Sequence, residues 1–247
     1  MIHIAETLSI HTVEDFLDAD EVRQLNELMD AALALQGRES FDLARTSTIH
    51  EVPGLTADQA RALYEPAGRV EMTDVPALAR TILDAAMMRS RPALTRGMPS
   101  IEGHRPWIFL EYQASQYISA HADGIAPDPA AWPRQIAAAS VTVAEAPDGS
   151  GAFYVETSGS EAPWTSPPLD APADYAPHMR FISEGTDGSS TWFTSMKRTR
   201  WTVQPAVGTL CLFGSQLVHG TEPVKAGRVR KFLTLLTADA PAAHGTR

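Results

Sequence analysis

The sequence predicts an α+β protein, with helices in the first part of the chain and an antiparallel β-core in the second. Apolar residues recur at helical spacing through much of residues 1–95. From about residue 105 to 240, short runs of β-forming residues alternate with turn-forming residues instead. Because the two patterns occupy separate parts of the chain, we expect helices packed on an antiparallel sandwich or barrel.

The helical part contains three predicted helices. Asp18 and Glu21 form a capping-box pattern ahead of the first, whose buried stripe comprises Val22, Leu25, Leu28, Met29 and Ala32. Thr56 is expected to cap a short second helix that ends near Tyr64. The third begins after Asp74 and Pro76 and runs through Ala77, Ile82, Leu83 and Met87. Residues Phe41–Pro53 are expected to be irregular or extended.

Eight short strands are predicted in the second part of the chain, bounded by turn residues. They are Trp107–Tyr112, Gln116–Ala120, Ile136–Ala144, Ala152–Glu156, Thr191–Thr194, Trp201–Gln204, Thr209–Phe213 and Arg230–Thr237. An insertion at about 157–199 interrupts them, and its Thr157–Ser190 portion is rich in Ser, Gly, Pro, Asp and Glu. A segment of that length is expected to be a lid or disordered. We expect all 247 residues to form one domain.

The composition of the chain limits which binding partners and which cellular location are expected. The net charge of −10 disfavours nucleic acid, because an acidic chain repels phosphate backbones. No apolar run is long enough to span a membrane and no signal peptide precedes the first helix, so a cytoplasmic location is expected. Cys211 is the only cysteine, which excludes an intrachain disulfide and a thiolate metal cluster. The expected substrate is therefore a small molecule or a protein. The sequence does not indicate the oligomeric state.

Three residues form a candidate metal site. His121 and Asp123 are two positions apart, and in an extended strand such positions point to the same face. His219 follows a later predicted strand and supplies a third ligand. Two histidines and one carboxylate on one face leave other coordination positions open, an arrangement that favours non-heme Fe(II).

A longer motif surrounds His219. It contains a Pro-x-x-Gly turn, an apolar strand ending in Phe, the histidine, a Pro-Val pair, a glycine and an arginine on the last strand. Here these are Pro205, Gly208, Phe213, His219, Pro223-Val224, Gly227 and Arg230. The motif resembles the C-terminal signature of the prolyl 4-hydroxylase-like branch of the Fe(II)/2-oxoglutarate dioxygenases. Tyr112, nine residues before His121, and the opening Asp15-Phe16-Leu17 helix are similar to that branch too.

The resemblance implies a double-stranded β-helix, which is a jelly-roll or cupin-like core, with flanking N-terminal helices. It implies an oxidoreductase that uses Fe(II), 2-oxoglutarate and O2, releases succinate and CO2, and hydroxylates, cyclises or desaturates its substrate. The family's arginine usually stands four residues before a hydroxyl residue, so Arg230 with Thr234 is expected to bind 2-oxoglutarate. Arg228 is the alternative. The Tyr112 hydroxyl either donates to the co-substrate or is satisfied within the core.

The substrate is expected to be a small, polar metabolite of natural-product biosynthesis. Arg105, Trp107, Trp192 and Arg200 are the candidate substrate contacts, and Trp201 lies beside them in sequence. Solvated arginines and core tryptophans are the competing interpretation. Two alternative functions remain: hydroxylation of a protein or carrier-bound side chain, and metal binding by a jelly-roll without redox activity.

Overall fold

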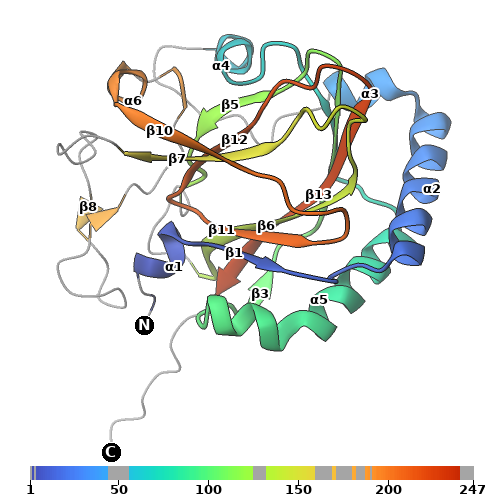
Figure 1. Ribbon diagram of the computed structural model, residues 1–247, viewed down its shortest axis with the longest axis horizontal. Helices are drawn as coiled ribbons and strands as arrows, with labels where there is room; N and C mark the ends of the chain where they lie inside the picture. Colours follow the sequence, from blue (N-terminus) through green and yellow to red (C-terminus); the bar gives the residue numbers. More distant parts are fainter. Residues whose placement is uncertain are drawn as a thin grey trace, which may run out of the picture.

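Two antiparallel sheets face each other at the centre of the computed structural model (Figure 1). The structure describes residues 2, 4–43, 56–124, 132–158, 169–170, 180–181, 187–189 and 191–239. The large sheet has the order β1 (Ile10–Val13), β11 (Leu210–Gly214), β6 (Arg134–Ala144), β13 (Arg228–Ala238), β4 (Ile108–Gln113) and β2 (Val70–Met72), and β3 (Gly103–His104) also pairs with β13. The small sheet has the order β10 (Arg198–Val203), β7 (Phe153–Ser158), β12 (Val218–Thr221) and β5 (Ile118–His121).

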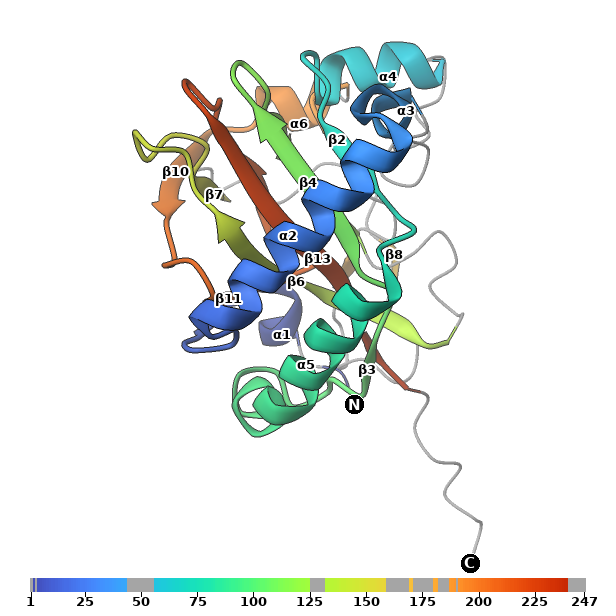
Figure 2. The same cartoon turned by 90° about the vertical axis from the view of Figure 1, so that its right-hand side faces the viewer.

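The helices cover the outer face of the large sheet. Figure 2 shows α2 (Ala19–Gln36) and α5 (Ala77–Gly97) crossing that face. As predicted, Asp18 and Glu21 cap α2 through a reciprocal capping box, and Leu25, Met29 and Leu33 are its buried residues. The mixed α and antiparallel β composition that the sequence predicts is therefore present.

The shorter helices agree with the prediction in part. Helix α4 (Ala57–Tyr64) is capped by Thr56 and ends where expected. Helix α3 (Arg38–Leu43) contains Phe41, so the expectation of irregular structure is wrong for residues 41–43, and residues 44–53 lie outside the described part. Phe41 is buried in the core between the helices and the large sheet, which explains why the chain stays helical there.

The strand alternation of the large sheet separates two packed layers. On β6, Val141 and Val143 face the helices, whereas Ala138 packs between the sheets. On β11, Leu210 and Leu212 face the helices while Cys211 and Phe213 point inward. This two-residue period means that each residue of a strand belongs either to the helix-covered layer or to the space between the sheets.

Several predicted elements need correction. Thr191–Thr194 is not a strand but part of the short helix α6 (Thr191–Ser195), whose Phe193 is buried beneath the Arg198 guanidinium. Strands β1 and β2 lie within the part predicted to be mainly helical, where they extend the large sheet. Strand β12 had no predicted counterpart, since its central Gly220 reads as a turn residue.

Little of the insertion at 157–199 belongs to the described residues. The described part of the insertion includes α6 and the strand pair β8 (Leu169–Asp170) and β9 (Arg180–Phe181). The remaining short helix, α1 (Ile4–Leu8), lies at the N-terminal end of the chain. Most of Thr157–Ser190, for which a lid or disorder is expected, lies outside the described part. No helix among the described residues is long and apolar enough to cross a membrane.

Candidate metal centre

His121, Asp123 and His219 come together on the inner face of the small sheet. His121 ends β5 and pairs directly with His219 on β12. Their Nε2 atoms lie 3.6 and 3.7 Å from Asp123 Oδ1, and one ligand atom from each residue lies within 4.8 Å of the others. The expected convergence of the three side chains is therefore what the structure shows.

Each imidazole is oriented by its own backbone. His121 Nδ1 lies 2.8 Å from the Ser119 carbonyl oxygen, and His219 Nδ1 lies 2.9 Å from the Leu217 carbonyl oxygen. A carbonyl oxygen only accepts, so each Nδ1 carries a proton, and Nε2, the nitrogen that faces Asp123, is the atom available to bind a metal. Metal-bound histidines are commonly fixed in this way, so the donor set fits a divalent metal ion.

Aromatic rings surround the two histidines. The Tyr64 ring from α4 meets the His121 ring edge-on at 4.7 Å between centroids. The rings of Phe213 and Phe153 lie 4.5 and 5.7 Å from the His219 ring. Burial holds the pKa of Tyr64 well above its usual value, so its hydroxyl stays protonated. These contacts fix the ring positions and limit the access of water to the histidines.

Lys231 is a buried cation in the same space between the sheets. It lies on the same face of β13 as Val229, Leu233 and Leu235, which all pack between the sheets. Its Nζ lies 3.4 Å from the Thr221 hydroxyl on β12, two residues after His219. No ion pair joins Lys231 to any described residue. Burial lowers the pKa of Lys231 to about 8, because an ammonium without a counter-ion is costly there.

Arg230, which is expected to bind 2-oxoglutarate, does not point into the space between the sheets. Arg230 is fully buried on the other face of β13, where it donates to Glu111 Oε2 at 2.8 Å and to Asn26 Oδ1 at 3.1 Å. It also forms an ion pair with Asp30 on α2. Its guanidinium is thus already satisfied by groups of the helix-covered layer. The alternative, Arg228, lies on the same helix-covered face of β13, with its Nη1 atom 3.6 Å from Asp30 Oδ1.

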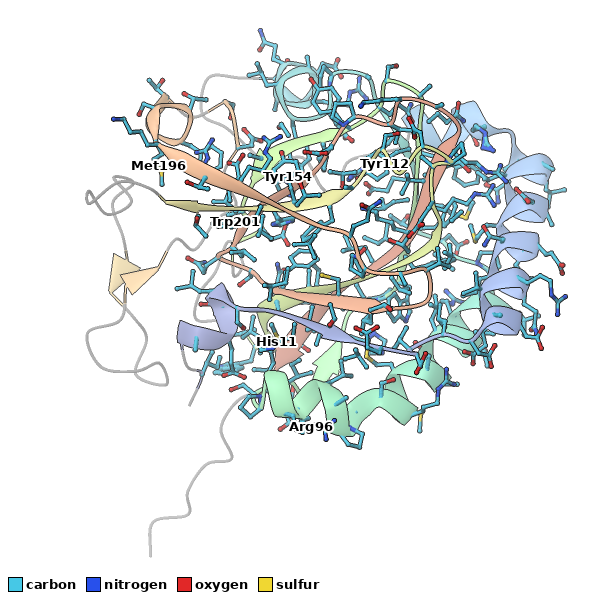
Figure 3. All side chains as sticks on the ribbon, viewed as in Figure 1. His11, Arg96, Tyr112, Tyr154, Met196 and Trp201 are labelled. Carbon is cyan, nitrogen blue, oxygen red and sulfur yellow. The ribbon has the colours of Figure 1, made fainter. Side chains whose placement is uncertain are left out.

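Thr234 shares the face of Arg230, and its hydroxyl donates to the Arg105 carbonyl oxygen at 2.6 Å. Tyr112 does point between the sheets, where its hydroxyl accepts from Arg69 Nη1 at 2.6 Å (Figure 3). Burial raises the pKa of Tyr112. The Tyr112 hydroxyl therefore has a protein partner and also lies in the layer that contains Lys231.

Two of the four candidate substrate contacts point away from the triad. Trp107 is buried beneath the helices, and its indole nitrogen donates to Asp84 Oδ1 at 2.9 Å. Arg200 lies on the outer face of the small sheet, stacked on Tyr154 and paired with Glu156 at 2.9 Å. Strand alternation on β10 turns Arg200 to the face opposite Trp201, whereas Trp107 lies just before β4 and packs in the helix-covered core.

The other two candidates remain predictions. Arg105 is exposed, and no contact recorded for the described residues joins its side chain to the triad. The Trp192 side chain lies outside the described part, although its backbone belongs to α6.

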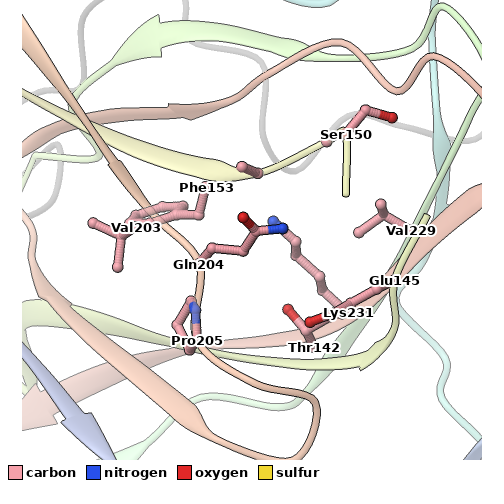
Figure 4. Close-up of a pocket in the computed structure, with 11 residues that line it drawn as sticks. Thr142, Glu145, Ser150, Phe153, Val203, Gln204, Pro205, Val229 and Lys231 are labelled. Carbon is pink, nitrogen blue, oxygen red and sulfur yellow. The ribbon is translucent and has the colours of Figure 1, made fainter. Parts of the chain in front are cut away.

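A small pocket opens beside Lys231 (Figure 4). Its lining includes Thr142, Phe153, Gln204 and Val229. The triad does not line this pocket, but Phe153 connects the two, since its ring packs against the His219 ring. The pocket and the triad therefore lie on either side of Phe153 in one interior space.

Lys231 is not among the residues predicted from the sequence, although the sequence contains a signal for it. A lysine at every-second-residue spacing from Val229, Leu233 and Leu235 is a charge on an otherwise apolar strand face. Because the opposite face of β13 also combines apolar residues with a cation, Arg230, the sequence did not show which face points toward the histidines.

No protein-family model and no curated protein sequence matches the chain. Its overall structure nevertheless matches iron- and 2-oxoglutarate-dependent oxygenases. A viral collagen prolyl hydroxylase from Paramecium Bursaria Chlorella virus-1 is 14% identical with a TM-score of 0.52, over 95% of this chain and 99% of that one. A Pseudomonas putida prolyl-4-hydroxylase is 17% identical with a TM-score of 0.52, over 95% of each chain.

Two enzymes of nogalamycin biosynthesis are similar in structure as well. The carbocyclase SnoK from nogalamycin biosynthesis is 12% identical with a TM-score of 0.56, over 97% of this chain and 85% of that one. The epimerase SnoN, in complex with Fe3+, alpha ketoglutarate and nogalamycin RO, is 12% identical with a TM-score of 0.55, over 98% and 88%. The expected resemblance to this superfamily, including its prolyl hydroxylase branch, is thus confirmed at the level of the fold.

Proposed function

We propose that this protein is an Fe(II)- and 2-oxoglutarate-dependent oxygenase. The observation that carries the proposal is the convergence of His121, Asp123 and His219, with the two Nε2 atoms 3.6 and 3.7 Å from the carboxylate oxygen. Two histidines and one carboxylate are the ligand set of non-heme Fe(II) oxygenases, which keep the remaining positions for co-substrates. The fold shared with such enzymes supports the same conclusion.

The two facing sheets then correspond to the double-stranded β-helix, or jelly-roll, of these enzymes. We infer a single oxygenase domain over residues 1–247, in which α2 and α5 support the large sheet. The triad belongs to the small sheet and Lys231 to the large one. In this arrangement the small sheet supplies the metal ligands and the large sheet supplies the residue proposed to bind the co-substrate, on opposite sides of the space between them.

Lys231 replaces Arg230 as the proposed anchor of 2-oxoglutarate. Its buried ammonium has no carboxylate partner among the described residues, and the distal carboxylate of the co-substrate supplies one. The Thr221 hydroxyl, which contacts both Lys231 and the Tyr112 hydroxyl, would orient that carboxylate further. Bound Fe(II) would supply the oxidising chemistry, in which one atom of O2 enters succinate, the other enters the substrate, and CO2 is released.

We further propose a small metabolite as substrate. SnoN and SnoK act in nogalamycin biosynthesis, and they match this chain over nearly its whole length. A prolyl hydroxylase from Trichoplax adhaerens in complex with a peptide fragment of hypoxia inducible factor is also similar, 13% identical with a TM-score of 0.53 over 94% of this chain and 84% of that one. A peptide or carrier-bound substrate is therefore the alternative outcome of a substrate screen.

The test uses anaerobic protein loaded with Fe(II) and 2-oxoglutarate. The native protein should show the visible charge-transfer absorbance of an Fe(II)–2-oxoglutarate complex, and on addition of oxygen it should form succinate. Asp123→Ala should lose both signals, because the metal loses its carboxylate ligand. Lys231→Met should lose the absorbance at co-substrate concentrations that saturate the native protein.

Arg228→Met is the matched control for the anchor, since it removes a neighbouring cation from the opposite face of the same strand. It should behave like the native protein. If iron-loaded native protein shows no such absorbance, the oxygenase proposal fails and a non-redox metal protein becomes the better account. If Arg228→Met loses co-substrate and Lys231→Met keeps it, the metal assignment stands but the anchor is wrong.

A further inference from the structure

Trp201 is a large exposed side chain on the same sheet face as the triad. It pairs with Val155 across β10 and β7, and Val155 pairs with His219 across β7 and β12. His219 pairs in turn with His121 on β5. Directly opposed residues in antiparallel strands point to the same face, so these four side chains form one row across the small sheet.

Burial along the row supports this placement. Val155 packs into the core between the sheets, and Val203, two residues after Trp201, packs against the same core. Trp201, at the edge of the sheet, is 58% exposed. Single exposed apolar residues are common on protein surfaces. Trp201 differs because its side chain lies on the same inner face of the small sheet as the metal ligands, at the edge where that face meets solvent.

The indole of Trp201 is held in a fixed orientation. Its Nε1 donates to the Thr157 hydroxyl at 3.1 Å, so the polar edge of the ring is already satisfied within the protein. Arg200, the neighbouring cation on β10, points to the opposite face and stacks on Tyr154 instead. What Trp201 offers to a bound molecule is therefore an apolar π-surface.

We propose that Trp201 stacks on a planar, unsaturated ring of the substrate and so determines which substrates bind. This inference rests on the proposed function, since it places the substrate over the metal centre. Two strand spacings separate Trp201 from His219, or roughly 10 Å. The ring held by Trp201 is therefore not the reacting group but lies about that far from the carbon that is oxidised.

The test uses full-length protein loaded with Mn(II) and 2-oxoglutarate, with 1-naphthol as a flat, neutral probe. Bound Mn(II) shortens the relaxation times of nearby protons. Naphthol protons should therefore show strong paramagnetic relaxation in the native protein. Trp201→Ala should weaken naphthol binding by about 2- to 10-fold, the range expected for loss of one aromatic stacking contact. Trp201→Phe should retain most of the binding.

Leu35→Ala is the control, because Leu35 is an exposed apolar residue on α2 behind the large sheet. It should match the native protein. The inference is overturned if Trp201→Ala binds naphthol as tightly as the native protein does. It is also overturned if the naphthol protons show no paramagnetic relaxation while the relaxation of water protons shows that Mn(II) is bound. If water relaxation shows no Mn(II) bound to native protein, the proposed function fails as well, so the two failures are distinguishable.

Discussion

Lys231 lowers the stability of the fold, a cost that the proposed carboxylate of 2-oxoglutarate would offset. Its buried ammonium has one long contact to the Thr221 hydroxyl and lies 5.8 Å from the centre of the Phe153 ring. It is therefore less stable than the same side chain in water, and its pKa falls to about 8. Active sites commonly retain such groups at the expense of stability. The cost is present at neutral pH, where the side chain is charged in both the folded and the unfolded protein.

Lys231→Met should therefore stabilise the ligand-free protein while abolishing co-substrate binding. The expected gain is on the order of 1–3 kcal/mol, because methionine fills similar volume without the buried charge. Urea unfolding of both proteins without metal or co-substrate measures the gain. A variant that is less stable than the native protein would show that Lys231 contributes to the fold rather than to binding.

Co-substrate affinity should also depend on pH. Because the pKa of Lys231 is about 8, its ammonium is progressively lost as pH rises through that value, and with it the attraction for a carboxylate. We expect 2-oxoglutarate to bind most tightly below pH 8 and to weaken steadily above it. Calorimetric titrations of the metal-loaded protein between pH 6.5 and 9.5 test this, and a constant affinity over that range would exclude Lys231 as the anchor.

At the scale of elements, Arg230 joins helix α2 to the large sheet. Its guanidinium bridges Asp30 on α2 and Glu111 on β4, and Arg38 also donates to Glu111, at 2.7 Å. The hydrogen bond from Arg230 holds the pKa of Asp30 below its ordinary value. The arginine thus serves the layer that supports the site rather than the site itself.

Arg230→Met should destabilise the protein by about 3–5 kcal/mol, because it leaves the buried Glu111 with fewer partners. Arg228→Met, on the same strand face but exposed, should change the unfolding free energy by less than about 0.5 kcal/mol. Urea denaturation compares the two. Folded Arg230→Met protein should still bind 2-oxoglutarate, and a loss of binding without loss of stability would restore the original assignment.

Strand β12 depends on a glycine beside the metal ligand. A Cβ on Gly220 would lie 2.3 Å from the Tyr154 hydroxyl and 2.8 Å from the Ile118 carbonyl oxygen. The second contact is backbone, so β12 must move away from β5 to accommodate a side chain.

Gly220→Ala should accordingly weaken metal binding by at least about 10-fold, since it displaces His219 from His121, and displaced ligands bind metals poorly. Titration of the protein with Mn(II), followed by electron paramagnetic resonance, measures this. Tyr154→Ala removes both the hydroxyl and the ring carbon Cζ, which would lie 2.3 and 2.5 Å from the added Cβ, and should partly restore affinity in the double variant. Native affinity in Gly220→Ala would mean that β12 does not constrain the ligand.

At the scale of the whole molecule, the metal should link β5 and β12 and so stabilise the fold. A ligand that binds only the folded state at 100 times its Kd adds about 2.7 kcal/mol. Thermal unfolding with and without excess Mn(II) should show a rise in Tm for the native protein and none for His219→Ala. An equal rise in both would indicate that the ion binds elsewhere.

The sequence by itself determined the class of the fold and the three ligands. Asp18 and Thr56 predict helix starts because a cap depends only on residues a few positions away. The change from helical to alternating spacing of apolar residues is likewise visible within short stretches of the chain. The pair His121 and Asp123 was recognisable because a spacing of two fixes a common face in any extended chain. His219 came from a motif whose residues are close together in sequence.

Only the tertiary structure decided which residues face the ligands. Each face of β13 combines apolar residues with a cation, Arg230 on one and Lys231 on the other, so the alternation does not say which face the helices cover. Packing of α2 on the large sheet places Arg230 in the outer layer and leaves Lys231 inside. Likewise, pairing through β7 aligns Trp201 with His219 and turns Arg200 away. Such choices depend on contacts between residues far apart in the chain, which local patterns do not encode.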